Sequence, residues 1–148
     1  MDAIKRILVP VDFDDTSEAA LDTAIRFAKN LGAKITLLHV EPFALSDVSQ
    51  ELFYEGPNAS TRARKTAHDR LFALIESRKS HGITIDSETR QGIVWDEILG
   101  AARHVGADLI VIGTHKRSSL SRGLLGSVAE NVVRSSTIPV MTIRASAS

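Results

Sequence analysis

The sequence predicts an α/β protein in which five parallel strands form one open sheet with helices on both of its faces. Short apolar runs of the kind that form buried strands alternate along the chain with segments whose apolar residues recur at helical spacing. Strands that alternate with helices pair in parallel and are joined by right-handed crossovers. The length of 148 residues and the apolar content of 43% fit one globular domain over residues 1–148.

The first half of the chain predicts two buried strands and two amphipathic helices, with a long loop between them. The strands are short runs rich in Val, Ile and Leu. The first helix follows acidic residues, and Gly32 suits its left-handed end. The loop contains Pro42, Gly56 and Pro57, which break regular structure. In order, we expect a strand over residues 4–11, a helix over 15–31, a strand over 34–40, an irregular loop over 43–58 with a short helical piece over 46–54, and a long helix over 60–81 that Gly82 ends.

The second half continues the alternation. Its first strand alternates apolar and polar residues, which is typical of a sheet edge. A buried strand later ends at Gly113, and a helix start follows at Ser127, because Ser127 and Glu130 have the S-x-x-E spacing of a capping box. In order, we expect a strand over residues 83–89, a helix over 94–105 that Gly106 ends, a strand over 109–112, a helix from 127, a strand over 140–143 and a frayed tail over 145–148.

Composition excludes several function classes. Lys plus Arg and Asp plus Glu both number 18, and this zero net charge argues against a nucleic-acid partner. The chain has no cysteine, so disulfides and thiolate catalysis are excluded. The N-terminal apolar run is short and is interrupted by Asp12, unlike a signal peptide, and no run is long enough for a membrane span. We therefore expect a soluble cytoplasmic protein without a membrane partner.

The basic loop between Gly113 and Ser127 is the first candidate site. It carries Lys116 and Arg117, and it leads into a helix N-terminus at Gly126-Ser127. Unpaired backbone N–H groups and the positive end of the helix dipole favour an anion at such a position. A capped helix after an ordinary solvated loop would have the same spacing, so the pattern alone leaves both interpretations open.

Asp12 is the second candidate, because it follows the first strand directly. In an open parallel sheet, ligands bind beyond the carboxyl ends of the strands, where the strand order reverses. If the order is 3-2-1-4-5, the first and fourth strands are neighbours, and Asp12 and Gly113 face the same crevice. Asp12 could then accept hydrogen bonds from a ribose or a base edge. The alternative is that Asp12 only caps the first helix.

The chain resembles the universal stress protein family over nearly its whole length. The segments ILVPVDFDDTSEAAL, LGAKITLLHVEP and ADLIVIGTHKRSSLSRGLLGSVAENVVRSSTIPVMTI look like the family's opening strand, second strand and signature end. Members that bind ATP carry Gly-x2-Gly-x9-Gly-Ser or the same motif ending in Thr. Here Gly113 matches the first position, Gly126 and Ser127 match the last two, and Lys116 replaces the second glycine. The resemblance implies a Rossmann-like fold of the adenine nucleotide alpha hydrolase type.

The resemblance also implies a function, a ligand and an assembly. It implies a stress-response regulatory module that binds ATP or AMP, with Mg²⁺ accompanying a triphosphate, and that acts as a homodimer. Asp12 would bind ribose or adenine, Val40 would line the adenine pocket, and Pro10, Val11 and Ile112 would add backbone or apolar contacts. Gly113, Gly126, Ser127 and Val128 would hold the phosphates, with Lys116 and Arg117 beside them. The dimer would form through the last strand, namely Pro139, Val140, Met141, Thr142 and Ile143.

Lys116 leaves two outcomes open. A non-glycine residue in a left-handed conformation costs roughly 1–2 kcal/mol, which is too little to break the fold. Its ammonium could replace lost backbone contacts, since a charge pair about 4 Å apart gains ~4 kcal/mol at an effective dielectric near 20, before desolvation. Its stem could instead fill the phosphate pocket. Because the other motif residues are present, our hypothesis is that nucleotide binding survives.

Other function classes have weaker support. No G-x-S-x-G or Walker sequence occurs, and the third strand ends without the carboxylate that a phospho-receiver needs, so we expect no enzyme beyond slow ATP hydrolysis. The five histidines lack metal-ligand spacing, and His39 lies in a strand as a hydrogen-bonded core residue. The serious rival is an interaction protein of the same fold that binds no nucleotide and works through an unknown protein partner, to which Trp95 could contribute.

Overall fold

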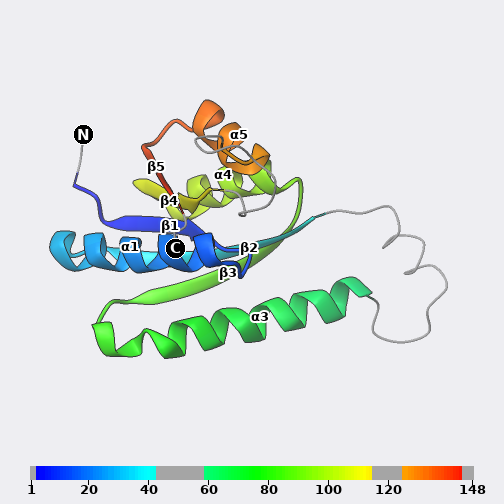
Figure 1. Ribbon diagram of the computed structural model, residues 1–148, viewed down its shortest axis with the longest axis horizontal. Coiled ribbons are helices and arrows are strands. Elements are labelled where there is room, and N and C mark those ends of the chain that lie inside the picture. The colour runs from blue at the N-terminus through cyan, green and yellow to red at the C-terminus, as the bar shows by residue number, and fades with distance from the viewer. Residues whose placement is uncertain (1–2, 43–58, 115–124, 145–148) are drawn as a thin grey trace.

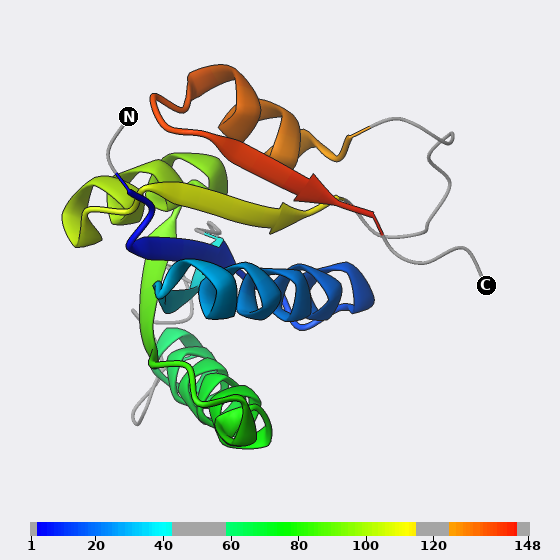
Figure 2. The ribbon, with the colours of Figure 1, turned by 90° about the vertical axis from the view of Figure 1, so that its left-hand side faces the viewer.

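The computed structural model describes residues 3–42, 59–114 and 125–144, which form a parallel sheet between two layers of helices (Figures 1 and 2). The strand order is β3-β2-β1-β4-β5, which confirms the predicted order. The elements are β1 (Arg6–Pro10), α1 (Asp15–Leu31), β2 (Lys34–Pro42), α3 (Ala59–Ser77), a 3-10 turn (Lys79–His81), β3 (Ile85–Gly92), α4 (Val94–Val105), β4 (Leu109–Gly113), α5 (Ser127–Ser135) and β5 (Val140–Ile143). The predicted helical piece over 46–54 lies outside the described residues.

Two apolar cores lie on opposite faces of the sheet. Successive side chains of a strand point to opposite faces, so Ile7 packs in the core under α1 and α3, whereas Leu8 packs in the core under α4 and α5. Both residues are fully buried. A strand buried on both faces reads as a continuous apolar run, which explains why β1, β2 and β4 are recognisable in the sequence.

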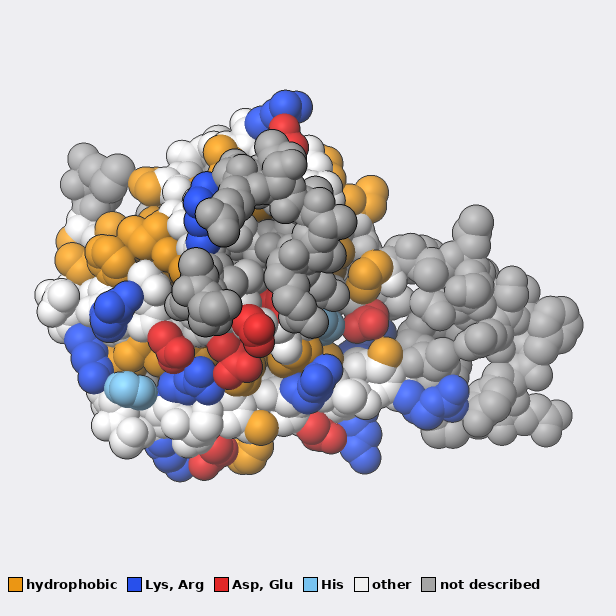
Figure 3. All heavy atoms as spheres, viewed as in Figure 1, with side chains coloured by type: hydrophobic (Ala, Val, Ile, Leu, Met, Phe, Trp, Pro, Cys, Tyr) orange, Lys and Arg blue, Asp and Glu red, His pale blue; other side chains and the backbone are white. Residues whose placement is uncertain are grey.

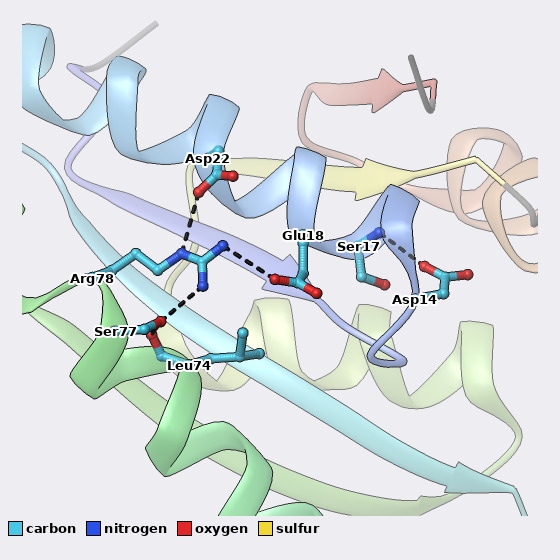
Figure 4. A network of polar contacts seen from close by, with 7 residues as sticks. All are labelled: Asp14, Ser17, Glu18, Asp22, Leu74, Ser77 and Arg78. Carbon is cyan, nitrogen blue, oxygen red and sulfur yellow. Dashed lines mark hydrogen bonds and ion pairs between the residues drawn. The ribbon is translucent and has the colours of Figure 1, made fainter. Parts of the chain in front are cut away.

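Local signals set both ends of α1. The carboxylate of Asp14 accepts a hydrogen bond from the backbone N–H of Ser17 at 2.9 Å, so Asp14 is the N-cap (Figure 4). At the other end, Gly32 has a φ of 67° and its N–H bonds to the carbonyl of Ala28. The alternative role for Asp12, as the cap of this helix, is therefore filled by a different residue.

The end of α3 differs from the predicted long helix over 60–81. The helix stops at Ser77, a 3-10 turn follows, and Gly82 ends it with a φ of 74°. No apolar residue follows Ile75 within the helix, so packing does not hold its last residues, and the Ser77 hydroxyl bonds to the carbonyl of Leu74. Arg78 instead reaches back to α1, where it contacts Glu18 and Asp22 at 3.3 and 3.2 Å (Figure 4).

The bounds of β3 and the cap of α5 also differ from prediction. β3 covers Ile85–Gly92 rather than 83–89, because it pairs with β2 as far as Pro42 and Gly92, beyond the alternating pattern. α5 begins at Ser127 as predicted, but its N-cap is Gly126 and has no side-chain cap. The expected capping box is therefore wrong: Ser127 is already inside the helix, and Glu130 pairs with Arg134 at 2.9 Å.

Candidate functional site

A pocket opens at the carboxyl ends of the strands, between β1 and β4. It holds about 590 Å³ of free space, including the solvent at its mouth, which suits a small organic ligand. β1 and β4 are adjacent here, with Ile7 opposite Leu109, although they are far apart in sequence. The pocket therefore occupies the position where the strand order reverses. Its lining consists of Pro10, Val11, Asp12, Thr16, Ser17, Leu38, Val40, Val94, Ile98, Ile112, Gly113, Thr114, Gly126, Val128 and Ala129.

The structure brings most of the predicted site residues together in this pocket. Ser127 is the one described candidate that is not part of the lining; it is exposed, and its carbonyl accepts a hydrogen bond from Asn131. Lys116 and Arg117 lie outside the described residues. The candidates that line the pocket are Pro10, Val11, Asp12, Val40, Ile112, Gly113, Gly126 and Val128.

Asp12 lines the pocket and is held in place by hydrogen bonds. Its Oδ1 accepts hydrogen bonds from the Ser17 hydroxyl at 2.7 Å and from the backbone N–H of Asp14 at 3.3 Å. Its own backbone N–H donates to the Ser17 hydroxyl oxygen at 3.0 Å. The residue is nevertheless exposed, so its carboxylate can accept a further hydrogen bond from a ligand.

The start of α1 carries negative charge beside the pocket. Burial works to raise the pKa of Asp14, but hydrogen bonds with Asp12, Ser17 and Thr16 outweigh it and hold the pKa below its usual value. Asp15 and Glu18 lie in the first turn of the helix. Figure 3 shows acidic side chains gathered over this end of α1. An anionic group is therefore disfavoured here, whereas hydroxyl groups find acceptors.

The start of α5 has the opposite character. Gly126 is its N-cap and supplies no side-chain oxygen, and the first helical N–H groups have no partner within a helix. Gly126, Val128 and Ala129 all line the pocket. The pocket thus meets two helix N-termini, one capped by a carboxylate and one without a side-chain cap, and only the second suits an anion.

Gly113 is required by a close approach between β4 and α1. A Cβ atom at this position would lie 2.6 Å from the backbone carbon and oxygen of Thr16, and 2.7 Å from its hydroxyl oxygen. These distances are too short for any side chain. Glycine therefore lets the first turn of α1 lie against the end of β4, and both Gly113 and Thr16 line the pocket.

An ion-pair network holds the α4 wall of the pocket. Arg90 at the end of β3 contacts Glu88 at 2.8 Å and Glu97 of α4 at 3.4 Å. The hydrogen bond and charge of Glu88, joined by those of Glu97, raise the pKa of Arg90, so the guanidinium stays charged. The network ties the first turn of α4, with its pocket residues Val94 and Ile98, to the sheet.

Sequence reasoning missed several lining residues. Val94 and Ile98 are four apart on one face of α4, which marks them as buried but does not say which cavity they meet. Thr16 and Ser17 follow the cap of α1, and their burial as polar residues is a signal that only the structure supplies. The remaining missed residues are Leu38, Thr114 and Ala129.

The described residues contain neither a cluster of metal-ligating side chains nor a helix that could span a membrane. Among the described residues, no group of three or more His, Asp or Glu side chains is arranged to hold a metal ion. Within the same part of the chain, none of the helices has both the length and the apolar character needed to cross a membrane. His39 bonds to the carbonyl of Val11 and to Glu41, which confirms the expected hydrogen bonding, but the residue is half-buried and not part of the core.

Comparisons with known proteins agree with the fold. The profile described as the universal stress protein family matches residues 3–144. The chain is 32% identical to universal stress protein MJ0531 of Methanocaldococcus jannaschii, over 95% of this chain and 82% of that protein. Its fold is similar to the solved structure of MJ0577 from the same organism, with a TM-score of 0.82, 28% identity and coverage of 99% and 100%.

A second solved structure is similar over nearly the whole chain. A universal stress protein in complex with cAMP matches with a TM-score of 0.69 and 26% identity, and the match covers 98% of this chain and 100% of that one. The family profile spans almost all of the sequence, and the relatives match along most of their own lengths. By sequence and by fold, this chain belongs to the universal stress protein family.

Proposed function

We propose that the chain is a cytoplasmic regulatory module of the stress response that binds an adenine nucleotide in the pocket between β1 and β4. The observation that carries this proposal is the set of chemical groups that meet in the pocket: apolar side chains, a carboxylate acceptor and a helix N-terminus without a side-chain cap. A nucleotide has a counterpart for each of these groups, namely a base, a ribose and a phosphate.

Each part of a nucleotide has matching groups in the pocket. The apolar side chains of Val40, Ile98 and Ile112 suit the faces of an adenine ring. Asp12 can accept hydrogen bonds from ribose hydroxyls, or from the base edge. The backbone N–H groups that begin α5 can hold phosphate oxygens. The related structure that contains cAMP supports the assignment, because cAMP combines adenine, ribose and phosphate.

The proposed ligand is ATP or AMP, with Mg²⁺ accompanying a triphosphate. Lys116 and Arg117 add positive charge to the loop before α5, and this charge favours phosphate. We propose that Lys116 substitutes for the glycine of the family motif rather than blocking the pocket.

Thermal unfolding with and without Mg-ATP tests the proposal. A ligand at about 100 times its dissociation constant adds ~2.7 kcal/mol to the free energy of unfolding, which is a shift of roughly 5–10 °C for a chain of this size. We expect this shift for the parent and a smaller one for Asp12→Asn. Absence of a shift in the parent, combined with a shift in Lys116→Gly, would show that the pocket exists but that Lys116 closes it. The rival interaction protein would show no shift in either.

We also propose a homodimer formed through β5. Among the described residues this strand pairs with β4 alone and lies at the edge of the sheet, and Val140–Ile143 are all half-buried. Pro139 is exposed at the start of the strand. An unpaired apolar edge favours pairing with a second copy of the chain. Light scattering on the purified protein should give the mass of two chains.

A further inference from the structure

Phe13 has an unusual backbone conformation next to the pocket. It is the one non-glycine residue with a positive φ in the described part of the chain, at 69°. A side chain in the left-handed region costs roughly 1–2 kcal/mol, and such strain persists only when surrounding contacts hold it. Phe13 immediately follows Asp12, so its conformation determines how the chain turns between the end of β1 and the start of α1.

Contacts from β2 and α3 hold the Phe13 ring. The ring centroid lies 4.8 Å from that of His39, with the planes tilted by 32°. The guanidinium carbon of Arg70 lies 4.6 Å from the same centroid, within the range of a cation–π contact. Phe13 therefore lies in a stack of three side chains, Arg70–Phe13–His39, which joins α3 to the turn that carries Asp12.

The other end of the stack acts on the pocket wall. The Nδ1 atom of His39 is 2.9 Å from the carbonyl oxygen of Val11, and its Nε2 atom is 3.1 Å from a carboxylate oxygen of Glu41. This carbonyl belongs to the peptide bond between Val11 and Asp12, and both of these residues line the pocket. The stack thus contacts the turn on both sides of Asp12, through the Val11 carbonyl and through the Phe13 ring.

We propose that the Arg70–Phe13–His39 stack is a positioning device that sets the direction of the Asp12 carboxylate and thereby makes nucleotide affinity depend on α3. This inference rests on the proposed nucleotide site. None of the described α3 residues lines the pocket, so Arg70 acts on the ligand only through Phe13 and Asp12. These three stacked side chains are positioning residues, and Asp12 is the group that meets the ligand.

The test uses variants that remove the stack but keep the fold. Arg70→Met removes the charge and keeps an apolar stem. Phe13→Gly removes the ring, and glycine adopts a positive φ without strain, so the turn itself can form. Lys65→Met is the matched control, because Lys65 is exposed on the same helix and belongs to neither the stack nor the pocket lining. The dissociation constant of Mg-ATP is measured by calorimetry, together with the unfolding temperature of each ligand-free variant.

The expected result is a loss of affinity that depends on Asp12. Aromatic and cation–π contacts have energies that correspond to changes of about threefold to tenfold, and we expect a weakening of this size for Arg70→Met and Phe13→Gly, with no change for Lys65→Met. In an Asp12→Asn background, Arg70→Met should have no further effect, because the group that it positions is gone. A purely structural role would instead lower the unfolding temperature and weaken binding equally in both backgrounds.

Two outcomes overturn the inference, and they can be told apart. If the parent binds Mg-ATP and Arg70→Met binds within about twofold of it, the stack does not position Asp12 and the nucleotide site stands. If the parent does not bind, the proposed function fails and the inference fails with it. If Asp12→Asn abolishes measurable binding, Arg70→Met is compared with Lys65→Met in the parent background. Weaker binding by Arg70→Met alone, at matching unfolding temperatures, supports the inference, and equal binding by the two variants overturns it.

Discussion

The replacement Asp14→Ala should destabilise the protein through the start of α1. The Asp14 carboxylate accepts two hydrogen bonds, from the backbone N–H of Ser17 at 2.9 Å and from the hydroxyl of Thr16 at 3.0 Å. Loss of an N-cap costs about 0.5–2 kcal/mol. Thr16 is only 4% exposed, so its hydroxyl also loses an acceptor in a buried place. We expect a total loss of about 1–3 kcal/mol, or ~2–10 °C in the unfolding temperature.

The same interaction predicts a dependence on pH. Because the folded-state pKa of Asp14 lies below its unfolded value, the carboxylate stabilises the fold above the unfolded pKa, and this contribution is lost as the pH falls through the folded pKa. The difference in stability between the parent and Asp14→Ala should therefore be full at pH 7 and should shrink from about pH 4 downward.

Thermal unfolding followed by circular dichroism, at several pH values, measures both effects. Asp14→Asn is the matched control: its amide oxygen can accept the same hydrogen bonds, so at pH 7 it should keep the cap but lack the contribution of the charge, and its stability should not depend on Asp14 ionisation. An Asp14→Ala variant as stable as the parent at pH 7 would refute the cap. An unchanged difference at low pH would refute the role of the charge.

Three further predictions concern packing and assembly. Gly113→Ala should lose about 1–3 kcal/mol in urea unfolding, because its Cβ would meet backbone atoms of α1, whereas the control Gly100→Ala meets only the side-chain ends of Arg90 and Arg103, at 3.2 and 3.8 Å, and should lose much less. Arg78→Met should lose about 0.5–1.5 kcal/mol, since the side chain bonds two carboxylates of α1 and is 15% exposed; equal stability in low salt would contradict this. Thr142→Lys places a charge on the edge strand and should give single chains in light scattering; an intact dimer would argue against assembly through β5.

Local signals in the sequence predicted the parts of the fold that depend on short-range chemistry. The helix over 15–31 was correct because acidic residues at its start and Gly32 at its end act through the adjacent backbone. The buried strands β1, β2 and β4 were predicted because burial on both faces demands continuous apolar residues. Once the order of the strands is known, Asp12 and Gly113 necessarily face the same crevice.

Other features depend on tertiary contacts that no local pattern encodes. Whether Gly126 or Ser127 caps α5 depends on a backbone angle, and the ψ of 161° at Gly126 makes glycine the cap despite a good serine signal. β3 continues to Gly92 because β2 offers it a partner. The positive φ of Phe13 could not be read from the sequence, since its cause is a ring stack with residues of β2 and α3.

The close approach of Thr16 to Gly113 bears on how relatives of this chain are interpreted. The backbone of α1 excludes any side chain at this position whether or not a nucleotide is bound. Selection for a stable fold would therefore keep this glycine in lineages that have abandoned the ligand. As a marker of nucleotide binding, Gly113 carries little information by itself. Asp12 is more informative, because it neither caps α1 nor belongs to either apolar core, and its hydrogen bonds with Ser17 and Asp14 leave the residue exposed to a ligand. Its retention over evolutionary time would report on the ligand together with the turn before α1.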